Sequence, residues 1–160
     1  MSIVKLTRMF LFIVLVLANR SLAEPVKSYE DSALKLKLES SVDVELQITT
    51  EDFGFDFVDQ VCEFSGKGKD TGVAGALVHS TERYSLKEFA DSMIGQYTRM
   101  MAAKSELVSE QKLDRQPGEW ILREYKVEEF GSIMRHFHVI VKDGRDNYAL
   151  VVVSPDNPKA

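Results

Sequence analysis

Two histidines, His136 and His138, stand two positions apart and are the residues best suited to metal chemistry. Side chains two apart on a strand point to the same face, so the two imidazoles could share a zinc or copper ion. Further ligands would have to come from elsewhere, and Glu124 and His79 are the candidates. The alternate residues of the same segment are mostly apolar and suit the core, which places the histidines on the wet or helix-covered face. A solvated pair is the favoured interpretation, and metal binding stays open as the alternative.

The single cysteine, Cys62, lies in an apolar and acidic segment, between Val61 and Glu63. A lone cysteine cannot form an internal disulfide, so the fold must depend on its core. The favoured interpretation is a buried, unreactive thiol in a strand, because free cysteine behaves as a small apolar side chain. The alternative is a disulfide-linked dimer through Cys62, and nothing beside it in the sequence indicates a nucleophile.

Familiar catalytic motifs are absent from the sequence. The Gly-Lys-Gly-Lys run at 66–69 lacks the spacing of a phosphate-binding loop, and no helix start follows it. No Gly-x-Ser-x-Gly turn is present, so serine hydrolase chemistry is not indicated. We therefore expect no enzymatic activity, no catalytic residues and no cofactor.

Two stretches combine acidic side chains with an aromatic ring, as a surface that recognises a basic protein would. Adjacent carboxylates are more often solvated turn residues than acid–base partners, because such partners need two different environments. The predicted partner surface consists of Glu51, Asp52, Phe53, Glu128, Glu129 and Phe130. The sequence thus favours a protein partner, and a basic one in particular.

Strands with alternating apolar residues must position these side chains. Before the midpoint of the chain, alternation or apolar runs predict strands over 34–38, 42–48, 53–57 and 73–78, and a polar mobile loop over 65–72. In the second half they predict strands over 107–113, 120–127, 133–141 and 148–153. Asp143-Gly144 favours a tight hairpin between the last two. Alternation indicates an antiparallel sheet that is covered on one side.

One helix interrupts the strands. Ser85-Leu86-Lys87-Glu88 forms a capping box, in which the serine and the glutamate satisfy first-turn amides reciprocally. Apolar residues then recur at helical spacing: Leu86, Phe89, Ala90, Met93, Ile94, Tyr97, Met100 and Met101. This pattern predicts an amphipathic helix over 86–104 that packs on the sheet, and we interpret its methionines as core rather than as a binding groove.

The predicted fold class is therefore α+β, with an antiparallel sheet and one long helix packed on it. Three stretches of the sequence resemble the PsbP/Mog1/DcrB-like group, namely Tyr84-Ser85-Leu86-Lys87-Glu88-Phe89, Gly118-Glu119-Trp120 and Tyr148-Ala149-Leu150-Val151-Val152. In that group a capped helix is followed by a strand after a Gly turn, a long strand and a Tyr-led last strand. The resemblance covers roughly the C-terminal half. It implies an α/β/α sandwich as a variant of the fold, and a non-enzymatic binding or assembly-factor domain without site residues to carry over.

The first 23 residues have the layout of a cleavable signal peptide. Lys5 and Arg8 precede an apolar stretch of about 10 residues, which is too short for a membrane span of roughly 20. Ser21-Leu22-Ala23 fits the small-x-small rule, so the predicted cut lies before Glu24. The predicted order is a signal peptide (1–23), a lead-in segment (24–33), a single α+β domain (34–154) and a C-terminal tail (155–160). No stable membrane anchor is expected.

Charge limits the partners. The whole chain carries a net charge of -5, and loss of three cations and no acid with residues 1–23 makes the mature chain -8. That field disfavours nucleic acid and anionic lipid as partners. We expect an exported protein, periplasmic or extracellular, that works as a binding or assembly-factor domain for a protein or small ligand. The alternative is an inhibitor or immunity-type protein that blocks a basic enzyme, such as a cell-wall hydrolase.

Overall fold

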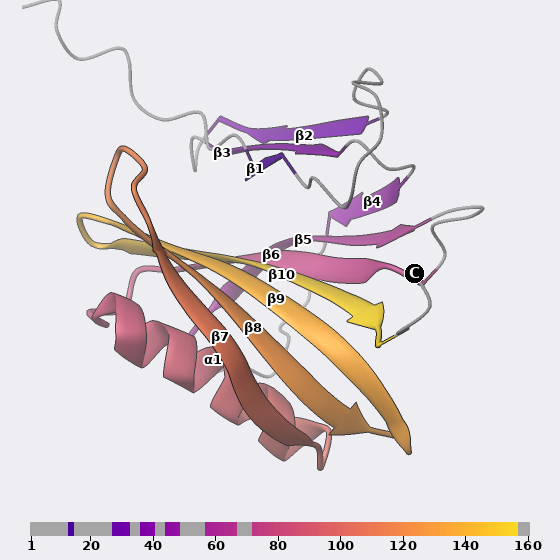
Figure 1. The fold of residues 1–160 in the computed structure, drawn as a ribbon. Coiled ribbons are helices and arrows are strands. Elements are labelled where there is room, and N and C mark those ends of the chain that lie inside the picture. The colour runs from indigo at the N-terminus through magenta and orange to yellow at the C-terminus, as the bar shows by residue number, and fades with distance from the viewer. Residues whose placement is uncertain are drawn as a thin grey trace, which may run out of the picture.

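The computed structural model describes residues 13–14, 27–32, 36–40, 44–48, 57–66 and 72–156, which form two sheets and one helix (Figure 1). The small sheet contains β1 (Ile13–Val14), β2 (Lys27–Asp31) and β3 (Leu36–Ser40) in the order β1-β3-β2. The elements of the main body are β4 (Val44–Ile48), β5 (Asp59–Gly66), β6 (Ala74–Ser80), α1 (Leu86–Met100), β7 (Lys104–Leu113), β8 (Glu119–Glu129), β9 (Ser132–Asp143) and β10 (Asp146–Pro155).

The main sheet has seven strands in the order β4-β5-β6-β10-β9-β8-β7, and every neighbouring pair is antiparallel. Strands that follow one another in the chain are neighbours in this sheet, except β6 and β7, which are connected through α1. Strand β10 lies between β6 and β9. The last strand therefore joins the two parts of the sheet that precede and follow the helix. This architecture confirms the predicted antiparallel α+β fold.

Helix α1 begins where the capping box predicts. Ser85 Oγ accepts from the Glu88 amide at 3.2 Å, and Glu88 Oε2 accepts from the Ser85 amide at 2.8 Å. These bonds hold the pKa of Glu88 below its usual value. The helix ends at Met100 instead of the predicted 104, because Ala102 turns into a left-handed conformation with φ of 49° and β7 starts at Lys104.

The face of the main sheet beneath α1, called the helix face, holds an apolar cluster under the first half of the helix. Phe89 and Ala90 are fully buried there against residues of four strands. The cluster comprises Val58, Val78, Leu86, Phe89, Ala90, Met93, Ile121, Ile140 and Ala149. A smaller cluster of Ile94, Tyr125 and Val127 lies under the second half. The predicted packing of the methionine-containing stripe on the sheet is thus confirmed for Met93.

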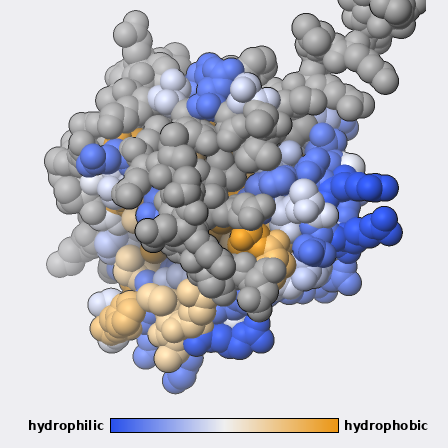
Figure 2. Space-filling model, turned by 180° about the vertical axis from the view of Figure 1, so that it is seen from behind, coloured by the Kyte–Doolittle hydropathy of each residue, from blue (hydrophilic) through white to orange (hydrophobic). Residues whose placement is uncertain are grey.

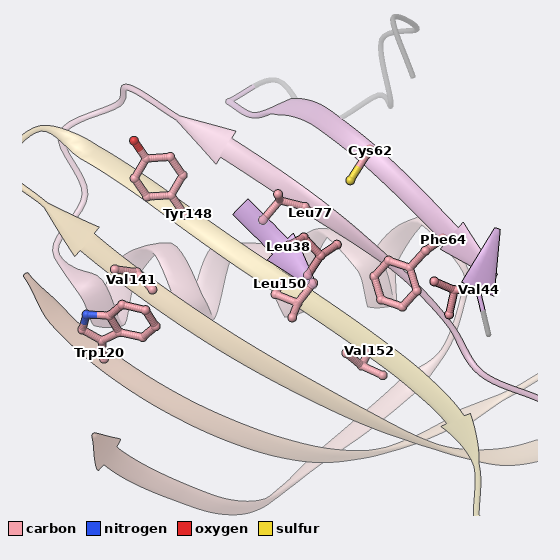
Figure 3. Packing of buried hydrophobic residues seen from close by; sticks show 10 residues of the cluster. All are labelled: Leu38, Val44, Cys62, Phe64, Leu77, Trp120, Val141, Tyr148, Leu150 and Val152. Carbon is pink, nitrogen blue, oxygen red and sulfur yellow. The ribbon is translucent and has the colours of Figure 1, made fainter. Parts of the chain in front are cut away.

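The opposite face, called the far face, carries the other large cluster (Figure 3). Its buried members are Cys62, Phe64, Leu77, Trp120, Val141, Tyr148, Leu150 and Val152, joined by Leu38 of the small sheet and Val44 of β4. The expectation that one side of the sheet is wet was wrong. An alternating pattern shows only that the two faces of a strand carry different residues. In this sheet both faces bury apolar side chains.

Gly75 shows how closely the central strands approach. A Cβ at this position would lie 2.1 Å from the Val151 carbonyl oxygen and 2.3 Å from the Phe64 ring. Because Gly75 pairs with Phe64 on one side and Val152 on the other, its missing side chain lets the ring lie across the strand.

The boundaries of several predicted segments agree only partly with the structure. The predicted lead-in contains β2, and of the predicted signal peptide only Ile13 and Val14 are described, as β1 beside β3. Phe53, Phe55 and the centre of the predicted loop at 67–71 lie outside the described residues. Within the described ranges, no helix has the length and apolar character needed to cross a bilayer.

Candidate functional site

The second half of α1 covers a group of polar side chains, called the polar cluster: Tyr97, Arg123, Tyr125, Glu129, His136 and His138. His136 is 1% exposed and His138 is 2% exposed. The expectation of a solvated pair was therefore wrong. Both side chains do share one face, as predicted, but α1 closes that face from water.

Strand register brings the cluster together. His138 lies opposite Arg123, and His136 lies opposite Tyr125, so that all four side chains point to the helix face. The His138 and Tyr125 rings lie 5.0 Å apart, and the two imidazoles lie 6.1 Å apart. Tyr97 of α1 contacts His136 edge-on at 4.9 Å. Three elements thus contribute to one buried group.

Arg123 is the charged centre of the polar cluster and only 2% exposed. Its guanidinium donates to Asp91 of α1 at 2.6 Å, to Glu110 of β7 at 2.7 Å and to the Tyr125 hydroxyl at 3.1 Å. Burial alone would lower the pKa of Arg123, but the bonds with Asp91, Tyr125 and Glu110 outweigh it and raise the pKa. Sequence reasoning missed this residue. The sequence did contain a hint: Arg123 stands between Ile121 and Tyr125 at a position that strand alternation assigns to the core, where a charged residue is unusual.

Glu129, a predicted surface residue, turns inward instead. Its carboxylate accepts a hydrogen bond from the Tyr97 hydroxyl, and its Oε1 lies 3.9 Å from His136 Nε2. Burial and this carboxylate raise the pKa of Tyr97. The contact ties the C-terminal half of α1 to the end of β8.

The imidazoles are buried and poorly partnered. Neither His138 nitrogen has a hydrogen-bond partner among the described residues, and neither does His136 Nε2. Burial, His136 and Arg123 lower the pKa of His138 to about 3. Burial also lowers the pKa of His136, and the nearby Glu129 opposes that shift in part. The site can therefore accept protons only at an energetic cost.

The structure does not bring the suggested metal ligands together. Glu124 lies on the far face, where it accepts from Arg135 at 2.9 Å, and His79 lies 3.0 Å from Asp146 between β6 and β10. Glu124 and His79, the candidates for further ligands, are thus not beside His136 and His138, because register sends Glu124 to the opposite side of β8. Over the described part of the chain, no three His, Cys, Asp or Glu side chains gather as metal ligands.

Two further potentially reactive side chains, Ser80 and Cys62, are not arranged for catalysis. Ser80 follows His79 along β6 and so points to the opposite face, where its hydroxyl donates to the Phe57 carbonyl at 2.5 Å. Ser80, His79 and Asp146 therefore do not form a nucleophile–base chain. Cys62 is fully buried in β5, as predicted, and burial raises its pKa to about 11. Its sulfur is not accessible to a second chain in this conformation.

The end of the main sheet nearest the β8–β9 turn exposes large apolar side chains. This apolar end comprises Met100, Leu107, Val108, Phe130 and Ile133, and Phe130 is 82% exposed. An apolar group projects at the corresponding edge in Figure 2, which views the molecule from behind. Exposed apolar side chains that gather at one edge indicate a contact surface more than a single scattered residue does.

Phe130 is also strained. Glu129 pairs with Ser132, so Phe130 and Gly131 form a two-residue loop, with φ of 48° and 75°. Positive φ at both positions is what a type I′ turn requires, and asparagine followed by glycine is preferred there. A bulky side chain in this conformation is unfavourable, and strained residues of this kind concentrate at functional sites.

The structure describes three of the six residues of the predicted partner surface. Glu128 and Phe130 are exposed at the apolar end, whereas Glu129 belongs to the polar cluster. Glu51, Asp52 and Phe53 lie outside the described residues. The charges around the turn are balanced, since the exposed residues nearby are Arg99, Lys104, Glu106 and Glu128. The described part of this surface is thus more apolar than acidic.

An antiparallel sheet of this order, with a capped helix across one face, defines a PsbP-like fold. Eleven chains of known structure match it. One is the solution structure of cyanobacterial PsbP (CyanoP) from Synechocystis sp. PCC 6803, with a TM-score of 0.64 and 7% sequence identity. The match covers 88% of this chain and 87% of that one, which confirms the predicted resemblance at the level of the fold and extends it beyond the C-terminal half. No protein-family model matches the sequence, and no curated protein sequence does so.

Proposed function

We propose that the protein is exported and acts as a non-enzymatic binding or assembly-factor domain, which recognises a protein partner through the apolar end. The observation that carries this proposal is Phe130, whose ring is 82% exposed and held in a left-handed backbone conformation. Exposure and strain both oppose a phenylalanine at this turn, and burial of the ring against a partner offsets them.

A non-enzymatic role is supported by the closed state of the polar cluster. A general base or nucleophile must lie within hydrogen-bond reach of its substrate. His136, His138 and Arg123 have nearly all of their surface covered by protein, and Cys62 is fully buried. The titratable groups of the domain interior thus serve the fold, and the exposed features are suited to recognition.

Photo-crosslinking from the turn tests the proposed surface. A photoreactive residue at position 130 is expected to capture a partner in cells, whereas the same residue at Arg145, in the exposed β9–β10 turn, is the matched control. The purified partner should bind the wild-type protein and bind Phe130→Asp about 30-fold more weakly, as loss of an aromatic anchor costs about 2 kcal/mol. Equal capture at both positions, or equal affinity of the variant, would show that the apolar end is not the binding surface.

The balance of charges distinguishes this proposal from the alternative inhibitor of a basic enzyme. Binding through the apolar end should persist as ionic strength rises, because apolar contacts are not screened. Inhibition of a basic hydrolase through electrostatic complementarity should weaken steeply over the same range. The net charge of -5 is the observation that keeps the second function as a candidate.

Export is tested by the mass of the natural product. The proposal expects a mature chain that starts at Glu24 and is recovered outside the cytoplasm. A chain that retains Met1 and is found in the cytoplasm would contradict the proposed location.

A further inference from the structure

The two halves of α1 are fastened to the sheet by different chemistry. The first half rests mainly on the apolar cluster around Phe89, and Asp91 adds one ion pair with Arg123. The second half has only Ile94 and Tyr97 as apolar contacts, with Tyr125, Val127 and Ala103. Its other contacts belong to the polar cluster, through Tyr97 to Glu129 and His136.

Protonation acts unequally on the two histidines of the polar cluster. His136 has Glu129 at 3.9 Å, so a first proton on His136 gains a counter-charge. His138 has no such partner: it lies opposite Arg123 on β8, and His136 stands two positions along its own strand. A proton on His138 would therefore meet two positive charges in a site closed to water.

The residues around His138 leave it without a negatively charged partner. The Tyr125 ring contacts His138 from β8. Asp91 of α1 and Glu110 of β7 bind its neighbour Arg123, and Tyr97 of α1 contacts His136 and Glu129. On the other side of β9, the residues opposite His138 and His136 are Val151 and Val153, which carry no charge. No described carboxylate is thus left to stabilise a cation at His138.

We infer that the second half of α1 forms an acid-sensitive latch, in which protonation of His138 releases residues 94–100 from β8 and β9 while the rest of the core stays packed. Opening lets water and counter-ions reach His138, whose pKa then rises from about 3 toward its ordinary value of 6.5. Acid therefore favours the open form. Between pH 6.5 and pH 5, the opening equilibrium constant should rise about 15-fold through this residue alone. The inference does not depend on whether the apolar end binds a partner.

Amide hydrogen exchange of the full protein tests the latch, with protection factors corrected for the intrinsic effect of pH. The latch predicts that residues 94–100 are less protected than β10 at pH 7, because they open as a separate unit. Their protection should fall about 25-fold between pH 7 and pH 5. Trp120 lies in the far-face cluster, so its fluorescence should stay unchanged while the latch opens. Equal protection of residues 94–100 and β10, or no fall at pH 5, would overturn the inference.

Substitution identifies the residue responsible. His138→Leu removes two nitrogens that lack partners, so it should fold and should abolish the fall in protection at residues 94–100. His138→Gln, which is polar but does not titrate, should do the same. The matched control is His79→Asn, because His79 of β6 lies beside Asp146 of β10 and away from α1. In this variant, the fall in protection at residues 94–100 should equal that of the wild type. An undiminished fall in both His138 variants would exclude His138 as the trigger.

Discussion

The two faces of the main sheet are buried by different means. On the far face, side chains of the main sheet meet Leu38 of the small sheet, and every buried member of the cluster is apolar or is the tyrosine Tyr148. On the helix face, α1 covers an apolar cluster with one half and the polar cluster with the other. From this difference we expect the far face to stabilise the fold through packing, and the stability of the helix face to depend on charge and pH.

The sharpest test of the far face is removal of a buried leucine. Leu150→Ala should lower the free energy of unfolding by about 3 kcal/mol, because Leu150 is 1% exposed in the centre of the sheet and a cavity would remain. Urea unfolding followed by the fluorescence of the single tryptophan, Trp120, measures the change. Val108→Ala, at an exposed position of β7, should change it by less than about 0.5 kcal/mol. Similar losses in both variants would contradict the packing interpretation.

Acid should destabilise the helix face by the next largest amount. The pKa of His138 is about 3 in the folded protein, below its unfolded value, so the unfolded state binds more protons between these values. The free energy of unfolding should therefore fall as pH decreases below 6.5, by about 1.4 kcal/mol per pH unit and by roughly 2 kcal/mol at pH 5. Urea midpoints across this range measure the slope. His138→Leu should reduce it, and an unchanged slope would show that other groups cause the acid sensitivity.

Replacement of the buried arginine should cost less than its three hydrogen bonds suggest. After Arg123→Met, Asp91 and Glu110 can regain water, because their side chains are 57% and 47% exposed. The expected loss is about 1.5 kcal/mol, below the 3–5 kcal/mol of a fully buried pair that is broken. Arg135→Met, on a partly exposed network with Glu124 and Asp156, should cost about 0.5 kcal/mol. Thermal unfolding of both variants compares them, and a loss above that of Leu150→Ala would reverse the ranking of the two faces.

The start of α1 should show the smallest effect. Ser85→Ala removes the acceptor for the Glu88 amide and should cost about 1 kcal/mol. Lys87→Ala, an exposed substitution in the first turn, is the matched control and should be nearly neutral. Circular dichroism during urea unfolding measures both. Equal values would mean that packing of Phe89 alone sets the start of the helix.

Local signals in the sequence were enough for the order of elements from β6 to β10 and for the start of the helix. Ser85 and Glu88 define a cap whatever the helix packs against, and apolar residues mark β8, β9 and β10. The covering of each face could not be predicted, because alternation separates faces without stating what lies on them. His136 and His138 were assigned to one face correctly but to the wrong environment for this reason.

The polar cluster depends on contacts between distant residues, which no local pattern contains. Glu129 looks like a surface acid beside Glu128, and its inward turn depends on Tyr97, 32 positions earlier. Arg123 carried a visible signal, since a charged residue occupied a core position of an alternating strand. Its partners Asp91 and Glu110 become neighbours only after β7, β8 and α1 have assembled.

The place of β10 in the sheet has a consequence for how the chain acquires its structure. Strands β4, β5 and β6 have an open inner edge, and so have β7, β8 and β9, until the final strand lies between them. Pairing of β6 with β10 joins Ala74 to Val153, which lie far apart in the sequence. The two halves of the sheet therefore stay separate until β10 has been synthesised and has paired with both β6 and β9.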